Sequence, residues 1–111
     1  MVYILLAPGF EEIEALAPVD LLRRANIETA TVSITGEPVP GSHGVTVTAD
    51  IALEDVDLSR ADMVVLPGGG PGYKNLGKDP RVEQLVRAAV EKDLWVAAIC
   101  AAPTLLGRWG L

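Results

Sequence analysis

Three short, mostly apolar segments constrain the fold of this chain more than any other feature of its sequence. They cover residues 2–7 (VYILLA), 62–66 (DMVVL) and 94–99 (LWVAAI), and turn-forming or small residues follow each of them. Apolar runs of this length are typical of strands that are buried on both faces of a parallel sheet. The sequence therefore predicts strands in these places and a fourth over residues 28–34 (ETATVSI).

Helical patterns separate these strands. Residues 11–26 begin with three carboxylates and end with two arginines, which suits the helix dipole, but Pro18 is expected to kink or divide this helix. Residues 80–92 form a second amphipathic pattern, and a further helix is expected from Ala101 onward. Residues 38–48 indicate a hairpin with Gly-Ser-His-Gly at its tip, and ALEDVD (52–57) indicates a helical turn.

Strands that alternate with helices predict a single α/β domain with a mainly parallel sheet, right-handed crossovers and helices on both faces. Binding sites in such sheets lie beyond the carboxyl ends of the strands. Three segments are expected to meet there: PGFEEIE (8–14), PGGGPG (67–72) and Cys100.

Composition excludes several classes of protein. Nine basic against fifteen acidic residues give a formal charge of −6, which argues against a nucleic-acid partner. No apolar stretch approaches the roughly 20 residues of a membrane helix, so no membrane partner is expected. A lone cysteine cannot form an internal disulfide, which favours a reducing cytoplasm. One cysteine and one histidine do not make a usual zinc site, and neither a metal nor a cofactor is expected.

Cys100, the only cysteine, lies between the last predicted strand and the helix that follows it. A sharp turn at such a junction lifts a side chain toward solvent, and the small residues Ala98 and Ala102 would permit that turn. The helix N-terminus would favour the thiolate, so Cys100 is a candidate nucleophile. The alternative is a buried structural cysteine, since a free cysteine often behaves as a small hydrophobe.

The glycine-rich segment LPGGGPG (66–72) is the second candidate feature. Consecutive glycines let the backbone approach a ligand and direct its N–H groups toward it, as an oxyanion or phosphate site requires. The segment matches neither the Walker pattern nor G-x-G-x-x-G. The alternative is a flexible loop.

Glu14 is the third candidate. It lies one turn into the first predicted helix, between Ile13 and Ala15 in an apolar stretch, where desolvation would favour a protonated carboxyl that can donate a hydrogen bond to a thiolate. A solvated helix face is the alternative. The neighbouring Glu11 and Glu12 are explained by the helix dipole alone.

Three segments, LAPGFEEIEALAPVDLLRRA (6–25), DMVVLPGGGPG (62–72) and VAAICAAPTLL (96–106), together resemble the ThiJ/PfpI superfamily, and within it the branch of the Parkinson-disease-associated protein deglycase. The resemblance implies a flavodoxin-like sandwich. It implies Cys100 as an oxidation-sensitive nucleophile with Glu14 as its acid partner, and the backbone N–H groups of Gly69 and Ala101 as an oxyanion hole.

The resemblance also implies a protective, cysteine-dependent enzyme that acts on small reactive carbonyls without a cofactor, as a lyase or hydrolase of the glyoxalase or deglycase type. Ala101 stands where protease-like members have a histidine, which argues against peptidase activity. Two alternatives remain open: a non-enzymatic redox-sensing or chaperone-like stress protein, and a structural domain with an inert cysteine.

Residues 1–111 are expected to form a partial domain that lacks the C-terminal part of the fold, since family members continue with further strands, helices and a later histidine. A homodimer or a complementing C-terminal chain would then complete the sheet. The only histidine, His43, lies in the predicted hairpin, which resembles the family's dimer interface. An exposed position is expected for His43, and its role is left open.

Overall fold

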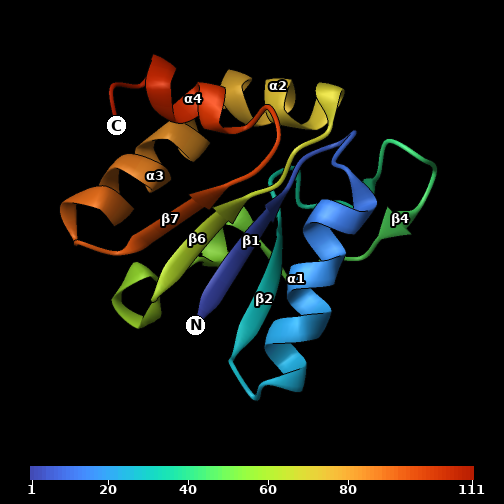
Figure 1. The fold of residues 1–111 in the computed structure, drawn as a ribbon, viewed down its shortest axis with the longest axis horizontal. Coiled ribbons are helices and arrows are strands. Elements are labelled where there is room, and N and C mark those ends of the chain that lie inside the picture. Colours follow the sequence, from blue (N-terminus) through green and yellow to red (C-terminus); the bar gives the residue numbers. More distant parts are fainter.

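Five parallel strands form the central sheet of the computed structural model, which describes residues 1–111 (Figure 1). They are β1 (Val2–Leu6), β2 (Thr29–Ser33), β5 (Ile51–Ala52), β6 (Met63–Leu66) and β7 (Trp95–Ala98), in the order β5-β2-β1-β6-β7. In the central strand β1, Tyr3 pairs with Ala30 of β2 and Val64 of β6. The predicted α/β fold with a mainly parallel sheet is confirmed. The two-residue strand β5 was not predicted, because a strand this short shows no periodicity.

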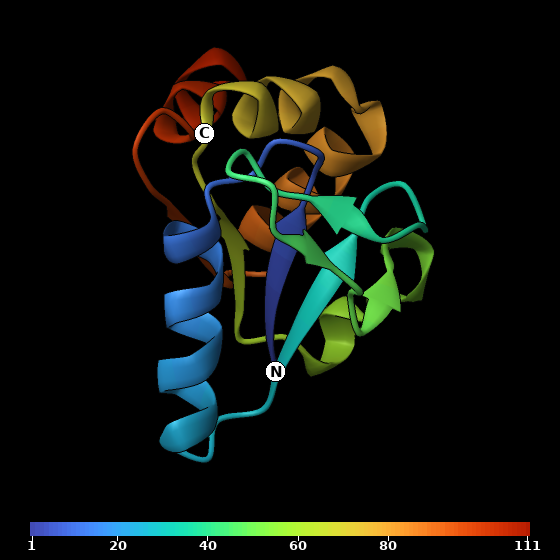
Figure 2. The same ribbon diagram turned by 90° about the vertical axis from the view of Figure 1, so that its right-hand side faces the viewer.

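Both faces of the sheet carry helices, as Figure 2 shows. On one face, α1 (Glu12–Arg24) and the antiparallel hairpin β3 (Val39–Pro40) and β4 (Thr46–Val47) enclose a core cluster that includes Ile4, Leu6 and Phe10. On the other face, α2 (Gly70–Lys78), α3 (Pro80–Glu91) and α4 (Pro103–Arg108) enclose a larger cluster. Alternate residues of β1 belong to the two clusters, as the pleat of a strand requires.

Two elements differ from the sequence-based expectations. The helix α1 is a single helix with Pro18 inside it, so the expected division is wrong. Proline removes the helical hydrogen bond to the Glu14 carbonyl, but Ala15 and Val19 are buried against the sheet on either side and keep the helix in place.

The glycine-rich segment leads directly into α2, with Pro71 near its N-terminus, where proline is well tolerated, so it is not a flexible loop. Two short 3₁₀ helices, η1 (Leu53–Asp55) and η2 (Leu58–Arg60), lie near the predicted helical turn.

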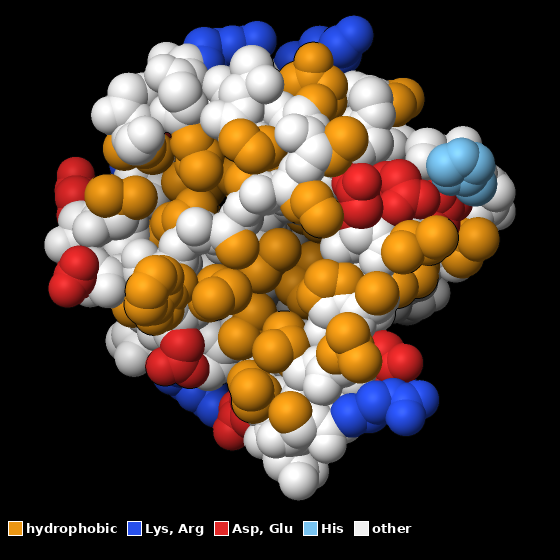
Figure 3. Space-filling view, viewed as in Figure 1, with side chains coloured by type: hydrophobic (Ala, Val, Ile, Leu, Met, Phe, Trp, Pro, Cys, Tyr) orange, Lys and Arg blue, Asp and Glu red, His pale blue; other side chains and the backbone are white.

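The α1 face of the sheet is only partly covered. An apolar groove of about 650 Å³ runs between α1 and the strands β6 and β7, and Figure 3 shows hydrophobic side chains across this hollowed face. None of the helices combines the length and the apolarity that a membrane crossing requires.

Candidate active site

Cys100 lies in a tight turn between β7 and α4. Its φ of 62° is in the left-handed region, which costs a residue with a side chain about 1–3 kcal/mol and is often found at functional sites. The thiol-bearing residue is exposed, so the alternative of a buried structural cysteine does not describe this chain. The predicted strand-to-helix turn is present, although α4 begins at Pro103 rather than at Ala101.

Gly68 brings Glu14 and Cys100 together. A Cβ atom on Gly68 would overlap Oε1 of Glu14 and would lie 2.7 Å from Cβ of Cys100. The carboxyl oxygen and the cysteine therefore border the same small space, which a side chain at position 68 would fill. The predicted proximity of Glu14 and Cys100 is present in the structure.

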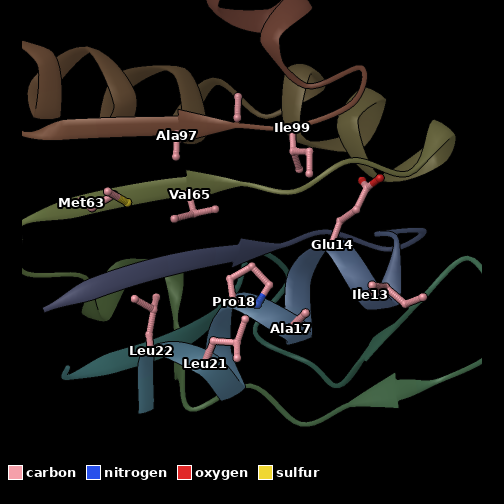
Figure 4. Close-up of a pocket in the computed structure, with 11 residues that line it drawn as sticks. Ile13, Glu14, Ala17, Pro18, Leu21, Leu22, Met63, Val65, Ala97 and Ile99 are labelled. Atoms are coloured by element: carbon pink, nitrogen blue, oxygen red, sulfur yellow. The ribbon is translucent and has the colours of Figure 1, made fainter. Parts of the chain in front are cut away.

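The carboxyl group of Glu14 is turned inward. It extends from α1 toward the ends of β6 and β7, while the neighbouring Ile13 points away (Figure 4). Its Oε1 atom is buried and has no hydrogen-bond partner within the chain. Glu14 is therefore not part of a solvated helix face, and a buried carboxyl oxygen without a partner is suited to exchange a proton with a group that enters the site.

The N–H groups of Gly69 and Ala101 make no hydrogen bond within the chain. Gly69 adopts a φ of 101° directly before α2, and a Cβ there would overlap the Gly9 carbonyl oxygen, so only glycine suits this position. An oxyanion hole needs backbone donors that are free to bind a substrate oxygen, and these two N–H groups meet that condition. Their use by a substrate remains a prediction.

Backbone hydrogen bonds hold the first loop (8–11) against the glycine-rich segment. The Glu11 N–H donates to the Gly68 carbonyl at 2.9 Å, and the Gly72 N–H donates to the Gly9 carbonyl at 3.1 Å. The Asn75 side chain adds a bond of 2.8 Å to the Pro8 carbonyl. The three segments that were expected to meet beyond the strand ends do meet: hydrogen bonds join the first two, and Cys100 borders the second at Gly68.

Glu12 has a role that the sequence analysis missed. It retains only 8% of its exposed area, and its carboxylate accepts hydrogen bonds from the N–H groups of His43 (2.7 Å) and Val45 (3.2 Å) and from the hydroxyl of Ser42 (3.3 Å). Nδ1 of His43 lies 3.0 Å from the same carboxylate, while the rest of the ring is exposed as predicted. Glu12 thus binds the tip of the β3–β4 hairpin to the start of α1.

The neighbouring Glu11 caps α1 by accepting the Glu14 N–H at 2.9 Å. Glu11, Glu12 and His43 together place three possible metal-ligand atoms within 4.8 Å of one another. However, the oxygens of Glu12 already accept hydrogen bonds from the hairpin. The cluster is therefore accounted for by a structural clamp.

Burial raises the pKa of Glu12, but the hydrogen bonds from the Val45 amide and from the ring and amide of His43 outweigh this effect and lower the pKa from 4.5 to about 2. A carboxyl whose pKa is lower in the folded state stabilises that state fully above its unfolded pKa. The contribution is lost as the pH falls from 4.5 to about 2.

We therefore expect the hairpin to detach from α1 only in strong acid. In an NMR titration, the amide resonances of His43 and Val45 should shift with a midpoint near pH 2. A Glu12→Gln variant should lack this transition, because it has no carboxyl at that position. A midpoint near 4.5 would show that the hairpin does not bind the carboxylate in the way the structure describes.

The fold and the site together define a class of protein: a parallel α/β domain with an exposed cysteine on a strained strand-to-helix turn beside an inward-facing carboxyl group. The model of the DJ-1/PfpI family matches residues 1–111, and the chain belongs to this family. The resemblance stated from the sequence is thereby confirmed.

Several relatives have related sequences and structures. The chain is 39% identical to the protein dj-1beta of Drosophila melanogaster, over 97% of this chain and 58% of that protein. It is 35% identical to the glutathione-independent glyoxalase DJR-1.2 of Caenorhabditis elegans, again over 97% and 58%. The crystal structure of Drosophila DJ-1beta superposes with a TM-score of 0.92 and covers 99% of this chain and 60% of its own. The chain thus spans about three fifths of the length of these relatives.

Proposed function

We propose that this chain carries the nucleophile and the acid of a cofactor-independent enzyme that acts on small reactive carbonyls such as glyoxals. The observation that carries the proposal is the shared space at Gly68, which both Oε1 of Glu14 and Cβ of Cys100 border. A nucleophile needs an acid or base within reach of the reacting atoms, and this geometry supplies one.

The proposed first step is addition to the carbonyl. The Cys100 thiolate attacks the carbonyl carbon, a C–S bond forms, and the carbonyl π electrons move to the oxygen. The N–H groups of Gly69 and Ala101 stabilise the resulting oxyanion. Glu14, as the proposed general acid, then transfers a proton to that oxygen, which gives a neutral hemithioacetal and leaves Glu14 able to accept a proton in the next step.

The relative from Caenorhabditis elegans is named a glutathione-independent glyoxalase, which supports carbonyl chemistry without a soluble thiol. The name of this relative also agrees with a role in protecting the cell from reactive carbonyls. The lone cysteine of this chain would then take the place of the missing thiol cofactor, in the reducing cytoplasm that a free cysteine favours.

A turnover assay tests the proposal. Freshly reduced protein in its native assembly should consume methylglyoxal, and the same protein after alkylation with iodoacetamide should not. Since Cys100 is the only cysteine, alkylation modifies a single thiol, and a loss of turnover can be assigned to that residue. An alkylation rate that rises only above about pH 8, as for an ordinary thiol, together with no turnover, would refute the proposal.

A redox-sensing role is the second candidate, and the exposure of Cys100 favours it. The solved structures include an oxidised DJ-1 of Toxoplasma gondii, 33% identical to this chain. Peroxide would transfer oxygen to the thiolate twice, with release of water or hydroxide, to give a sulfinate. Intact mass after mild peroxide treatment should then increase by two oxygen atoms, whereas an inert structural cysteine would show neither oxidation nor turnover.

We also propose that further polypeptide covers the apolar groove and pairs with the edge of β7, supplied either by another copy of this chain or by additional strands and helices. The groove beside α1 and the unpaired edge of β7 support this proposal. A parallel sheet is normally covered on both faces.

A further inference from the structure

The first loop (8–11) lies between two partners. On one side its backbone bonds to the β3–β4 hairpin: the Gly9 N–H donates to the Pro40 carbonyl, and the Ser42 N–H donates to the Phe10 carbonyl, both at 2.8 Å. On the other side it bonds to Gly68 and to the start of α2, as described above. The loop is therefore held in place by the hairpin as well as by the glycine-rich segment.

We infer that Glu12 is a positioning residue for the Cys100 site, because its buried carboxylate holds the hairpin tip on the loop that fixes Gly68 and Gly69. The catalytic meaning of this inference rests on the proposed function. The physical coupling between Glu12 and the thiol does not depend on the proposed function, and it can be measured directly.

The contacts form a continuous path from Glu12 to the cysteine. Glu12 binds the amides of residues 43 and 45 of the hairpin. The hairpin backbone binds Gly9 and Phe10, and the adjacent Glu11 N–H binds the Gly68 carbonyl. Gly68 in turn borders Cys100. Movement of the hairpin would therefore shift the first loop and, through it, Gly68, the residue that borders Cys100.

The carboxylate fits its position closely. A Cβ atom on Gly41 would lie 2.5 Å from Cδ and 2.8 Å from Cγ of Glu12, so the hairpin approaches the carboxylate as nearly as a glycine permits. A charged acceptor also binds two amides and a hydroxyl more strongly than a neutral one would. Both the charge of Glu12 and the absence of a side chain at Gly41 are needed for the clamp.

The test compares Glu12→Gln with Glu37→Gln, which removes the same charge from an exposed position at the start of the hairpin. Amide hydrogen exchange and iodoacetamide alkylation are measured on the protein in its native assembly. In Glu12→Gln, the amides of Glu11 and Gly72 should exchange at least about tenfold faster, together with those of the hairpin. Alkylation of Cys100 near neutral pH should slow by at least about threefold, because the groups that support the thiolate are displaced. Glu37→Gln should change neither quantity.

Faster exchange that is confined to the hairpin amides, with the thiol rate unchanged, would overturn the inference, because Glu12 would then stabilise the hairpin alone. If Glu12→Gln does not fold, Gly41→Ala displaces the carboxylate while keeping its charge, and it should give the same spread of faster exchange to Glu11 and Gly72. A wild-type protein that shows no carbonyl turnover would refute the proposed function but would leave these readouts intact.

Discussion

Replacing Gly68 by alanine is expected to lower the turnover of methylglyoxal by about 100-fold, which corresponds to about 2.7 kcal/mol of activation free energy. The new Cβ would overlap Oε1 of Glu14 and would lie 2.7 Å from Cβ of Cys100 and 3.2 Å from the Ile99 carbonyl oxygen. Cys100 is held in a strained turn and has little freedom to move away. Glu14 would therefore be displaced, and a misplacement of about 1 Å at a reacting group can cost about 100-fold in rate.

Gly70→Ala is the matched control for this substitution. Gly70 lies two residues further along the same segment, its φ is not positive, and a Cβ there meets nothing within 4 Å. The control variant should retain wild-type turnover, since it removes a glycine without filling the space between Glu14 and Cys100. Steady-state kinetics of both variants, with circular dichroism to confirm the fold, provide the measurement.

The alkylation rate of Cys100 gives a second readout. It should decrease in Gly68→Ala and not in Gly70→Ala, because only the first substitution separates the carboxyl from the thiol. Equal losses in the two variants would show that the flexibility of the glycine-rich segment matters, and not the contact at Gly68.

The central strands β1 and β6 were predictable because burial on both faces of a parallel sheet leaves a direct mark on the sequence. All five residues of β1 are buried, which produces the continuous apolar run VYILL. In contrast, α2 begins with Gly70, Pro71 and Gly72, residues with low helix propensity, so tertiary packing decides its conformation. The position of Pro71 near the N-terminus was the one local signal of that helix.

The candidate site was predictable where it lies at strand ends and not where it depends on distant contacts. Cys100 and the glycine-rich segment follow directly after β7 and β6, and Glu14 interrupts an apolar helix stretch. Glu12 gave no such signal, because it is buried by a hairpin 31 residues away in sequence. A glycine at position 41, just before the hairpin tip, is the only sequence feature that hints at a close approach.

The second large effect concerns the assembly: the 111-residue chain in isolation is expected to self-associate or aggregate. Met63, Val65 and Ala97 line the floor of the groove on the α1 side of β6 and β7, and α1 covers this side of the two strands only in part (Figure 4). At its rim, Ile13 retains 73% and Leu21 64% of their exposed area. The edge of β7 is also unpaired, and such an edge readily adds another strand.

A complementing polypeptide should suppress this association. Because the relatives extend well beyond the matched region, the C-terminal part of Drosophila dj-1beta is a suitable probe. Adding it should convert aggregates or dimers into a defined complex with a cooperative thermal transition, as followed by light scattering and thermal melting. A discrete homodimer that does not bind the added fragment would instead support closure of the sheet by a second copy of the chain.

A double substitution at the rim of the groove tests which surface is responsible for the association. The double variant Ile13→Lys, Leu21→Lys places charges where an apolar partner would dock, so it should shift the light-scattering mass toward that of a monomer. Val90→Lys is the control, because Val90 is 42% exposed but lies on α3, on the opposite face of the sheet. Val90→Lys should associate like the unmodified chain. A monodisperse wild-type monomer that melts cooperatively would refute the prediction, because the apolar groove beside α1 would then be stable without any cover.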